Sequence, residues 1–228
     1  MLCRLLLYVD YYKEPYAKPL NLAWLWIKQR RLEKGDWSMK ILFVDSCLRE
    51  NSRTKILADR LLQKIIAENP SAKIEEIQLQ KANLKPLNAE LLQKRDVLLQ
   101  AGKTDDEFFE FANQFAAADK IVVAAPYYDL QFPSLLKIYL ENICVCGITF
   151  KYSEQGIPVG LCHADELIYV TTAGGYLGEY NLGYDYLRNL CQMFFAITKQ
   201  RLIAAEGLDI YGNDPEQILR EVCAKENI

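Results

Sequence analysis

The hydrophobic pattern from residue 39 onward alternates between two periods. Short continuous apolar runs are typical of strands that are buried on both faces of a parallel sheet. Longer segments carry an apolar side chain at every third or fourth position, which is typical of helices that pack one face against a core. The runs predict strands at Lys40–Asp45, Lys73–Leu79, Lys120–Ala125, Glu166–Thr172 and Arg201–Ala205. The longer segments predict helices at Ser52–Glu68, Asn88–Gln100, Thr104–Ala118, Pro133–Cys146, Tyr184–Ala196 and Asp214–Lys225.

Local signals mark several ends of these elements. Thr104 is expected to cap the helix that it opens, and Pro215 fits the first turn of the last helix. Two short arms at 149–152 and 157–160 surround a turn. Strands that alternate with helices indicate one α/β domain over residues 39–228, with a parallel sheet covered on both faces.

Ligands bind such sheets at the carboxyl ends of the strands, so the loops that follow the strands are where chemistry is expected. The loop after the first strand supplies hydroxyls and positive charge at a helix start, from Ser46, Ser52, Arg53 and Thr54. Free amides of the first helical turn add to them, and together they predict a phosphate site. The alternative is ordinary helix capping by Asn51 or Ser52. The loop lacks the glycine motifs of dinucleotide-binding folds and of P-loop nucleotide hydrolases, which argues against ATP or a bound dinucleotide.

Two further loops favour a flat ligand. The loop after the third strand is aromatic where loops are usually polar, with Pro126, Tyr127, Tyr128, Asp129 and Leu130. A planar ring would explain these side chains, although tyrosines that pack on a neighbouring helix or on a dimer partner would explain them too. The loop after the fourth core strand contains Thr172, Ala173, Gly174 and Gly175. Paired glycines let a backbone approach a flat ligand closely, and the alternative is a plain turn.

Together these segments resemble one family, the flavodoxin-like FMN-dependent NADH-azoreductases and NAD(P)H-quinone oxidoreductases. The similarity covers residues 39–212. In that family a Pro-Met-Tyr-Asn-Phe-like loop embraces the isoalloxazine, and a Ser-Arg-Gly-Gly-like loop closes its pyrimidine side; the corresponding segments here are 126–130 and 172–175. The segment Gly147–Gly156 is similar to the family's Gly-Val-Thr-Phe-Arg-Tyr-Thr-Glu-Asn-Gly, and Ala205–Leu208 also recurs there.

The resemblance implies a fold, a cofactor and a reaction. The fold would be a three-layer sandwich whose five-stranded parallel sheet has the order 2-1-3-4-5. FMN would be held at its phosphate by the residues of the first loop and at its ring by the other two loops. NADH or NADPH would deliver a hydride, and a quinone, an azo compound or a nitroaromatic would then take two electrons, with no catalytic protein nucleophile. The family also works as a homodimer, which fits the aromatic character of Tyr127, Tyr128, Tyr176 and Tyr180.

Two residues depart from the family's pattern. Asp129 stands where the family has an asparagine, and Ala173 stands where it has an arginine. Both changes disfavour an anionic reduced flavin, because nearby charge sets which electronic state is stabilised. They predict a lower midpoint potential than that of a typical member, and an altered substrate preference. Two rival functions stay open: a flavodoxin-type electron carrier that serves a protein partner, and a binding module that keeps the fold and has lost FMN.

Composition narrows the partners and the compartment. The formal net charge of −3 gives no electrostatic footprint for nucleic acid, and no apolar run approaches the ~20 residues that span a bilayer. The 7 cysteines are odd in number and scattered, which suits reduced, buried thiols in the cytoplasm. Cys144 and Cys146 are expected two apart on a helix, so that they form neither a metal site nor a redox pair. His163 is expected to be a solvated loop residue with no catalytic role.

The first 38 residues differ from the rest of the chain. All 3 tryptophans lie before Met39, in a segment with 7 basic and 4 acidic residues, and Leu20, Ala23, Trp24 and Ile27 fall at helical spacing. One interpretation is an amphipathic helix that touches a membrane surface or a partner, and a second is an added element that packs on the domain. The favoured interpretation is a start site assigned too far upstream, because Met39 opens the first strand.

Overall fold

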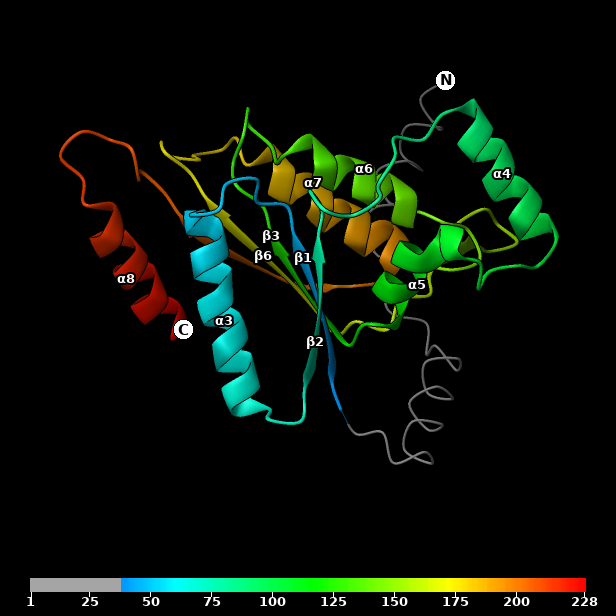
Figure 1. Ribbon diagram of the computed structural model, residues 1–228, viewed down its shortest axis with the longest axis horizontal. Helices are drawn as coiled ribbons and strands as arrows, with labels where there is room; N and C mark the ends of the chain where they lie inside the picture. Colours follow the sequence, from blue (N-terminus) through cyan, green and yellow to red (C-terminus); the bar gives the residue numbers. More distant parts are fainter. Residues whose placement is uncertain (1–37) are drawn as a thin grey trace, which may run out of the picture. The chain divides into compact units, whose positions relative to one another are not determined.

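The computed structural model describes residues 38–228, and the expectations for residues 1–37 lie outside the described residues. Parallel strands form a central 5-stranded sheet in the order β2-β1-β3-β6-β7 (Figure 1). They are β1 (Lys40–Asp45), β2 (Lys73–Gln78), β3 (Lys120–Ala124), β6 (Glu166–Thr172) and β7 (Lys199–Ala205). When only the strands of this sheet are counted, the order is the expected 2-1-3-4-5, so the flavodoxin-like topology is confirmed.

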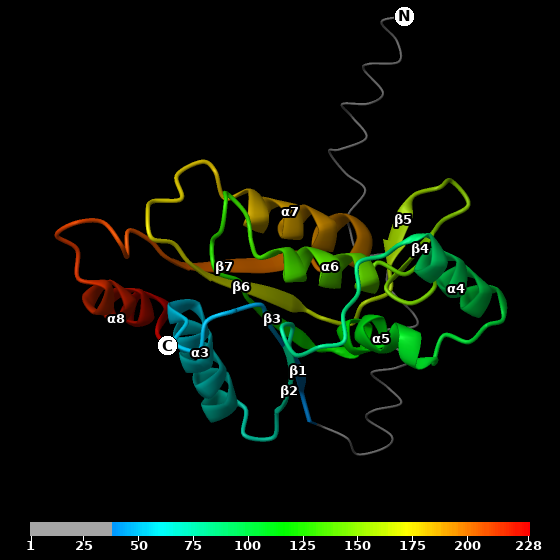
Figure 2. The ribbon, with the colours of Figure 1, turned by 45° about the horizontal axis from the view of Figure 1, so that its top comes forward.

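Helices cover both faces of the sheet. One face carries α3 (Arg53–Glu68) and α8 (Pro215–Glu226). The other face carries α4 (Ala89–Gln100), α5 (Glu110–Ala117), α6 (Ser134–Ile143) and α7 (Leu182–Leu190). Figure 2 shows the sheet between these layers, with α6 and α7 above it and α3 and α8 below it. The three-layer sandwich is therefore confirmed.

Successive side chains of each central strand supply two different cores. In β1, Ile41 and Phe43 pack toward α3 and α8, whereas Leu42 and Val44 pack toward the opposite layer, and each of them is at most 1% exposed. A strand with both faces covered has to be apolar at every position, which is why β1 shows a continuous apolar run. The side chains of the edge strand β2 are mostly exposed instead, and its sequence is correspondingly more polar.

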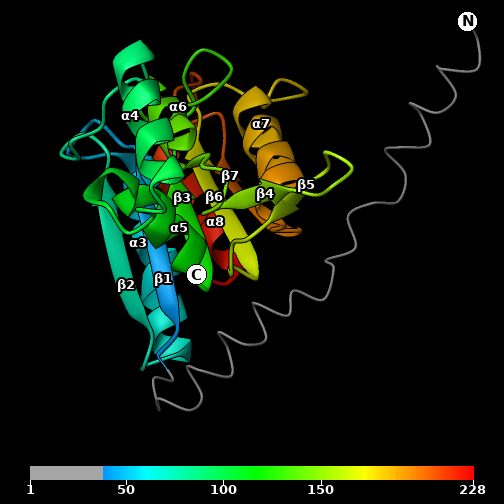
Figure 3. The same ribbon diagram turned by 90° about the vertical axis from the view of Figure 1, so that its right-hand side faces the viewer.

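A small hairpin interrupts the alternation of strands and helices. Its strands β4 (Phe150–Tyr152) and β5 (Pro158–Gly160) pair antiparallel, as the two predicted arms suggest. The hairpin packs on the π-helical turn Cys191–Phe195 that continues α7 (Figure 3). Gly160 makes this contact possible, because a Cβ at this position would lie 2.3 Å from the carbonyl carbon of Phe195.

The predicted helix at Thr104–Ala118 begins later than expected. Its first turn is a 3-10 turn at Glu107–Phe109, and α5 follows it directly. Asp106 caps this turn, since its Oδ1 accepts a hydrogen bond of 3.0 Å from the amide of Phe108. The expectation that Thr104 is the cap is therefore wrong. Both residues are good capping types, and the sequence offers no means of choosing between them.

The predicted helix at Pro133–Cys146 ends earlier than expected. The last residue of α6 is Ile143, because the hydroxyl of Thr149 donates to the Ile143 carbonyl at 2.7 Å and draws the chain into a turn. Cys144 ends the helix and Cys146 lies beyond it, exposed, so the two cysteines do not share a helix. Among residues 38–228 there is no helix that is both long enough and apolar enough to cross a membrane.

Candidate active site at the carboxyl edge of the sheet

The loops that follow β1, β3 and β6 are hydrogen-bonded to one another at the carboxyl edge of the sheet. The amide and the hydroxyl of Ser46 donate to the carbonyl of Ala124, at 2.9 and 2.8 Å. The amide of Tyr127 donates to the carbonyl of Thr172 at 3.1 Å. The hydroxyls of Thr54 and Thr172 lie 2.6 Å apart. The three loops singled out in the sequence therefore form one continuous rim.

The hydroxyls of the first loop have different surroundings. Ser46 and Thr54 are fully buried, and their hydroxyls are engaged within the rim. Ser46 donates its hydroxyl hydrogen to a backbone carbonyl and so braces the rim, while its contact with a phosphate stays a prediction. Ser52 is the N-cap of α3, and its oxygen accepts from the amide of Lys55 at 3.4 Å, so the capping interpretation is confirmed for Ser52. The groups left to meet an anion are the first amides of α3, the Ser52 hydroxyl and the side chain of Arg53.

Arg53 points at a fourth loop, which begins with the recurring segment Ala205–Leu208 but holds none of the residues predicted to bind the cofactor. Its Nη1 and Nη2 both lie 2.9 Å from Oδ1 of Asp209, and Nη1 lies 3.4 Å from the carbonyl of Leu208. This loop follows β7, whose carboxyl end lies at the same edge because the sheet is parallel. The expectation that ligands bind at the carboxyl ends of the strands, which points to the other three loops, points to this loop as well. An aspartate is not a residue type expected to bind a phosphate, so the identity of Asp209 alone does not indicate that it belongs to the site.

The aromatic loop after β3 is a tight turn. The amide of Tyr128 donates to the carbonyl of Gln131 at 3.0 Å, and the amide of Gln131 donates back at 2.7 Å. Between them, Asp129 and Leu130 have φ values of 48° and 68°, in the left-handed region, as in a type I′ turn. Left-handed backbone costs a non-glycine residue roughly 1–2 kcal/mol. Both side chains are exposed at the tip of the turn, so Asp129 brings an open carboxylate to the rim.

The base of the aromatic loop is held more firmly than its tip. Pro126 is buried, and Tyr127 and Tyr128 are half-buried. The hydroxyl of Tyr127 donates to the carbonyl of Tyr180 at 3.0 Å, which ties this loop to the segment that precedes α7. The packing interpretation therefore holds in part for Tyr127, whose hydroxyl has a partner within the chain.

The double-glycine loop is bonded along its length to the loop after β7. The carbonyl of Gly174 accepts from Asp209 at 2.9 Å and the carbonyl of Gly175 accepts from Gly207 at 2.8 Å. Ala173 is buried, with 3% of its surface exposed. A Cβ on Gly174 would lie 2.5 Å from Oδ2 of Asp209, whereas a Cβ on Gly175 would meet nothing within 4 Å. The exposed backbone at Gly175 leaves room for a flat ring, and the free amides at the start of α3 can meet a phosphate, so these residues fit FMN.

The thiols and the histidine offer no reactive nucleophile at this rim. Burial raises the pKa of the Cys47 thiol to about 12, against an opposing hydrogen bond with Ser52. Burial likewise raises the pKa of Cys144 to about 11. His163 lies in the loop before β6, as expected, where it is half-buried and its backbone amide donates to the Ala116 carbonyl at 2.9 Å. Within residues 38–228 no group of three or more His, Cys, Asp or Glu side chains could hold a metal ion.

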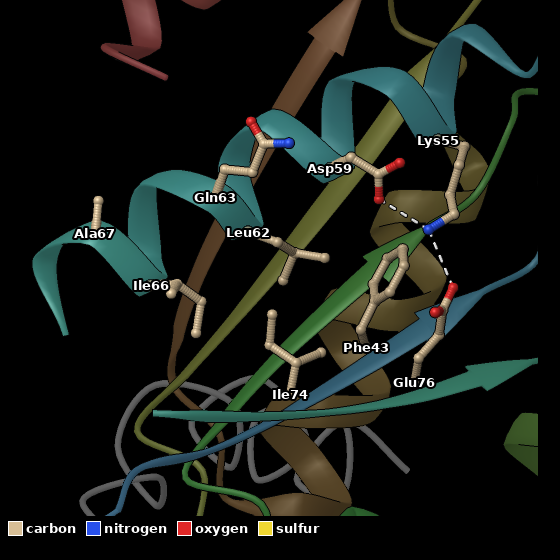
Figure 4. A pocket seen from close by; sticks show the side chains of 9 residues that line it. All are labelled: Phe43, Lys55, Asp59, Leu62, Gln63, Ile66, Ala67, Ile74 and Glu76. Atoms are coloured by element: carbon tan, nitrogen blue, oxygen red, sulfur yellow. Dashed lines mark hydrogen bonds and ion pairs between the residues drawn. The ribbon is translucent and has the colours of Figure 1, made fainter. Parts of the chain in front are cut away.

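A groove of about 530 Å³ lies away from the rim, between α3 and the strands β1 and β2 (Figure 4). Phe43, Ile74 and Leu62 form part of its apolar wall. Its cation is already paired, because Nζ of Lys55 lies 2.8 Å from Asp59, 3.0 Å from Glu76 and 4.5 Å above the centre of the Phe43 ring. None of the predicted site residues lines this groove, so the candidate site stays at the carboxyl edge.

Comparison with known proteins agrees with this fold. Residues 39–225 match a family described as having a flavodoxin-like fold. The chain is 37% identical over 193 residues to FMN-dependent NADH:quinone oxidoreductase 2 of Clostridium acetobutylicum, with 82% of this chain and 95% of that protein covered. It is 33% identical over 190 residues to the FMN-dependent NADH:quinone oxidoreductase of Clostridium perfringens, with the same coverage.

A solved structure gives the same result. The azoreductase of Bacillus anthracis superposes with a TM-score of 0.70 at 25% identity, covering 82% of this chain and 96% of that one. The family match spans the whole sheet and all four loops of the rim. This chain therefore belongs to the flavodoxin-like family that its FMN-dependent NADH:quinone oxidoreductase relatives represent.

Proposed function

We propose that this protein is an FMN-dependent oxidoreductase. It takes a hydride from NADH or NADPH and passes two electrons to a quinone, an azo compound or a nitroaromatic, with donor and acceptor bound in turn. The observation that carries the proposal is the convergence of the three loops at one edge of the sheet, in a chain 37% identical to a protein named as an FMN-dependent NADH:quinone oxidoreductase.

The start of α3 is the place for a phosphate. The first amides of a helix lack acceptors within the helix and carry the positive end of its dipole, so they favour an anion. Ser52 adds a hydroxyl there, and Arg53 adds a guanidinium whose side chain is 39% exposed. The hydrogen-bonded hydroxyls of Thr54 and Thr172 fix the distance between this helix start and the double-glycine loop.

The remaining rim is suited to a flat ring. Tyr127 and Tyr128 supply an aromatic wall, and the open space beside Gly175 lets a ring lie against backbone. Bound FMN supplies the hydride and electron transfer itself. The chain's own part is to hold the ring and to place charge near it, since the described thiols with resolved pKa shifts stay protonated near neutral pH.

We also propose a cytoplasmic homodimer. The described cysteines are free, which fits a reducing compartment. Tyr176 and Tyr180, beside the double-glycine loop, are 70% and 63% exposed. Large exposed aromatic side chains next to a site are typical of an interface that completes it.

The visible spectrum of the purified protein, before and after anaerobic NADH, tests the proposed function. Flavin absorption is expected, and it should bleach in stopped-flow mixing with NADH and return on addition of a quinone. A Gly175→Val variant fills the open space beside the ring, so it should bind flavin much more weakly while keeping its fold. A protein that binds FMN but is not reduced directly by NADH would be an electron carrier, and one that binds no FMN would refute the proposal altogether.

A further inference from the structure

The carboxylate of Asp209 lies between two parts of the rim. Its Oδ1 is 2.9 Å from both terminal nitrogens of Arg53, and its Oδ2 is the atom nearest to the missing Cβ of Gly174. Its amide donates to the carbonyl of Gly174 at 2.9 Å, so the backbone holds the residue at this place. A negative charge is therefore fixed beside the start of α3, where the helix favours an anion.

This carboxylate already pairs with the guanidinium of Arg53, the first residue of α3. Both Nη1 and Nη2 of Arg53 are directed at Asp209, and Nη1 also contacts the carbonyl of Leu208 at 3.4 Å. A phosphate that recruits Arg53 has to compete with this carboxylate for the same donors, and it brings up to two negative charges close to a third. Both side chains are partly exposed, at 39% and 66%, so the ion pair can exchange its partner without unpacking a core.

We propose that Asp209 sets the affinity of this site for phosphorylated ligands by competing with the phosphate for Arg53. The inference rests on the proposed function, and it deepens it by assigning a residue that opposes cofactor binding. The side chain of Asp209 also packs against Gly174, and an asparagine of the same size keeps this packing, so neutralising the carboxylate changes only the charge beside the phosphate. Asp209 thus lowers the preference of the site for FMN over riboflavin, which has the same ring and no phosphate.

Titration of the flavin-free full chain with FMN and with riboflavin tests this proposal. Asp209→Asn keeps the size and the backbone contacts of the side chain but removes its charge. It is expected to tighten FMN binding by about three- to fivefold, the upper part of the range for one partly exposed charge pair, and to leave riboflavin binding within twofold. The matched control is Asp96→Asn, which removes an aspartate of similar exposure (59%) paired with Arg95 on α4, and which should change neither affinity.

A second pair of variants tests whether the effect passes through Arg53. Arg53→Gln should weaken FMN binding and spare riboflavin, and in that background Asp209→Asn should improve FMN binding by less than twofold. Equal weakening of both flavins by Asp209→Asn would show that the carboxylate braces the loop, and would overturn the proposal. No change in either flavin, or a full gain without Arg53, would overturn it as well. Failure of the proposed function is a separate result, since the wild-type chain would then bind neither flavin.

Discussion

Single side chains at the rim set the charge that a bound flavin would experience. Asp129 sits at the tip of the turn after β3 with its carboxylate exposed, and Ala173 contributes no cation to the loop after β6. Negative charge near a ring that gains electrons disfavours the reduced, anionic state. The two residues therefore act in the same direction, and Asp129 is the one that can be neutralised without changing shape.

Asp129→Asn is expected to raise the midpoint potential of the bound flavin by about 10–20 mV. An exposed carboxylate a few ångströms from the ring contributes on the order of 0.5–1 kcal/mol, and 30 mV of a two-electron potential corresponds to about 1.4 kcal/mol. Spectroscopic titration against a reference dye measures the shift. Asp105→Asn, at an aspartate that is also exposed but lies outside the rim loops, is the control. A potential that stays in place or falls in the Asp129 variant contradicts this interpretation.

At this scale the sequence predicts which residues gather at the rim better than it predicts what each atom does. Ser46 follows a strand, which predicts its place at the rim, and it lies there, but its hydroxyl donates to Ala124 on the neighbouring strand. That partner is set by the register of β1 against β3, which the local pattern does not contain. The pairing of Asp209 with Arg53 is hidden in the sequence for a similar reason, since most of the domain separates the two residues along the chain.

Among the elements, the amino ends of three neighbouring strands share one ion cluster around a buried carboxylate. Glu166 in β6 lies between Lys120 in β3, at 2.6 Å, and Lys199 in β7, at 3.2 Å, and the three residues are in direct register. Burial alone would raise the pKa of Glu166, but the hydrogen bonds and charges of the two lysines outweigh it and hold the pKa below its ordinary value. Only 8% of the Glu166 side chain is exposed, against 24% for Lys120 and 71% for Lys199, so solvent screens the pair with Lys120 less than the pair with Lys199.

Glu166→Gln is expected to lower the free energy of unfolding by about 1–3 kcal/mol at neutral pH. A carboxyl whose pKa is lowered by folding stabilises the protein above its unfolded pKa, and this contribution is lost as the pH falls through the folded pKa. The difference between the variant and the wild type should therefore shrink as the pH drops from 5 toward about 3. Urea unfolding at several pH values measures it. A difference that is the same at every pH would mean that Glu166 acts through its size and not through its charge.

Two glycines that look alike in the sequence should respond differently to a methyl group. At Gly160 the added Cβ would press on the backbone of the π-helical turn, 2.3 Å from the carbonyl carbon of Phe195, and backbone cannot move aside cheaply. At Gly174 the nearest atom, at 2.5 Å, is the end of the exposed side chain of Asp209, which can rotate away. Gly160→Ala is therefore expected to cost about 2–4 kcal/mol of stability, and Gly174→Ala less than about 1 kcal/mol. Thermal unfolding of the two variants compares them, and similar losses would show that the backbone at Gly160 yields as easily as the side chain of Asp209.

The order of the helices and strands is predictable because each hydrophobic period indicates one type of element, but the residues at which the elements begin and end are not predictable in this way. A strand buried on both faces must be continuously apolar, so β1, β3 and β6 can be placed from the sequence. The end of α6 depends on the hydroxyl of Thr149, six residues past Ile143, and such a contact forms only once the chain has turned. The start of the helical segment that leads into α5 depends on whether Thr104 or Asp106 caps it, and in the structure the cap is Asp106.

At the scale of the whole molecule, the parallel topology of the sheet is what brings the candidate site residues together. Every strand of the sheet ends at the same edge, so loops that are far apart in sequence become neighbours as soon as the order β2-β1-β3-β6-β7 is fixed. The sequence shows the strands and the loops, and this one rule brings the loops together. The rule that strands end at one edge does not predict the surface beyond the rim. In the described part of the chain, large aromatic and apolar side chains are exposed there: Tyr176, Tyr180, Leu182 and Tyr186.

These side chains lead to a prediction about assembly. Leu182 and Tyr186 are one turn apart on α7 and are 43% and 37% exposed, and Tyr180 precedes the same helix at 63%. Sedimentation of the wild-type chain should give twice the mass of one chain, and Leu182→Asp should shift it to a single chain, because a carboxylate buried at an interface costs several kcal/mol. Ile56→Asp on α3, a residue exposed to the same degree (44%), should leave the dimer intact. If the flavin lies beside this surface, the monomeric variant should also bind FMN more weakly. A wild-type monomer, or an equal response of the two variants, would show that α7 does not form the interface.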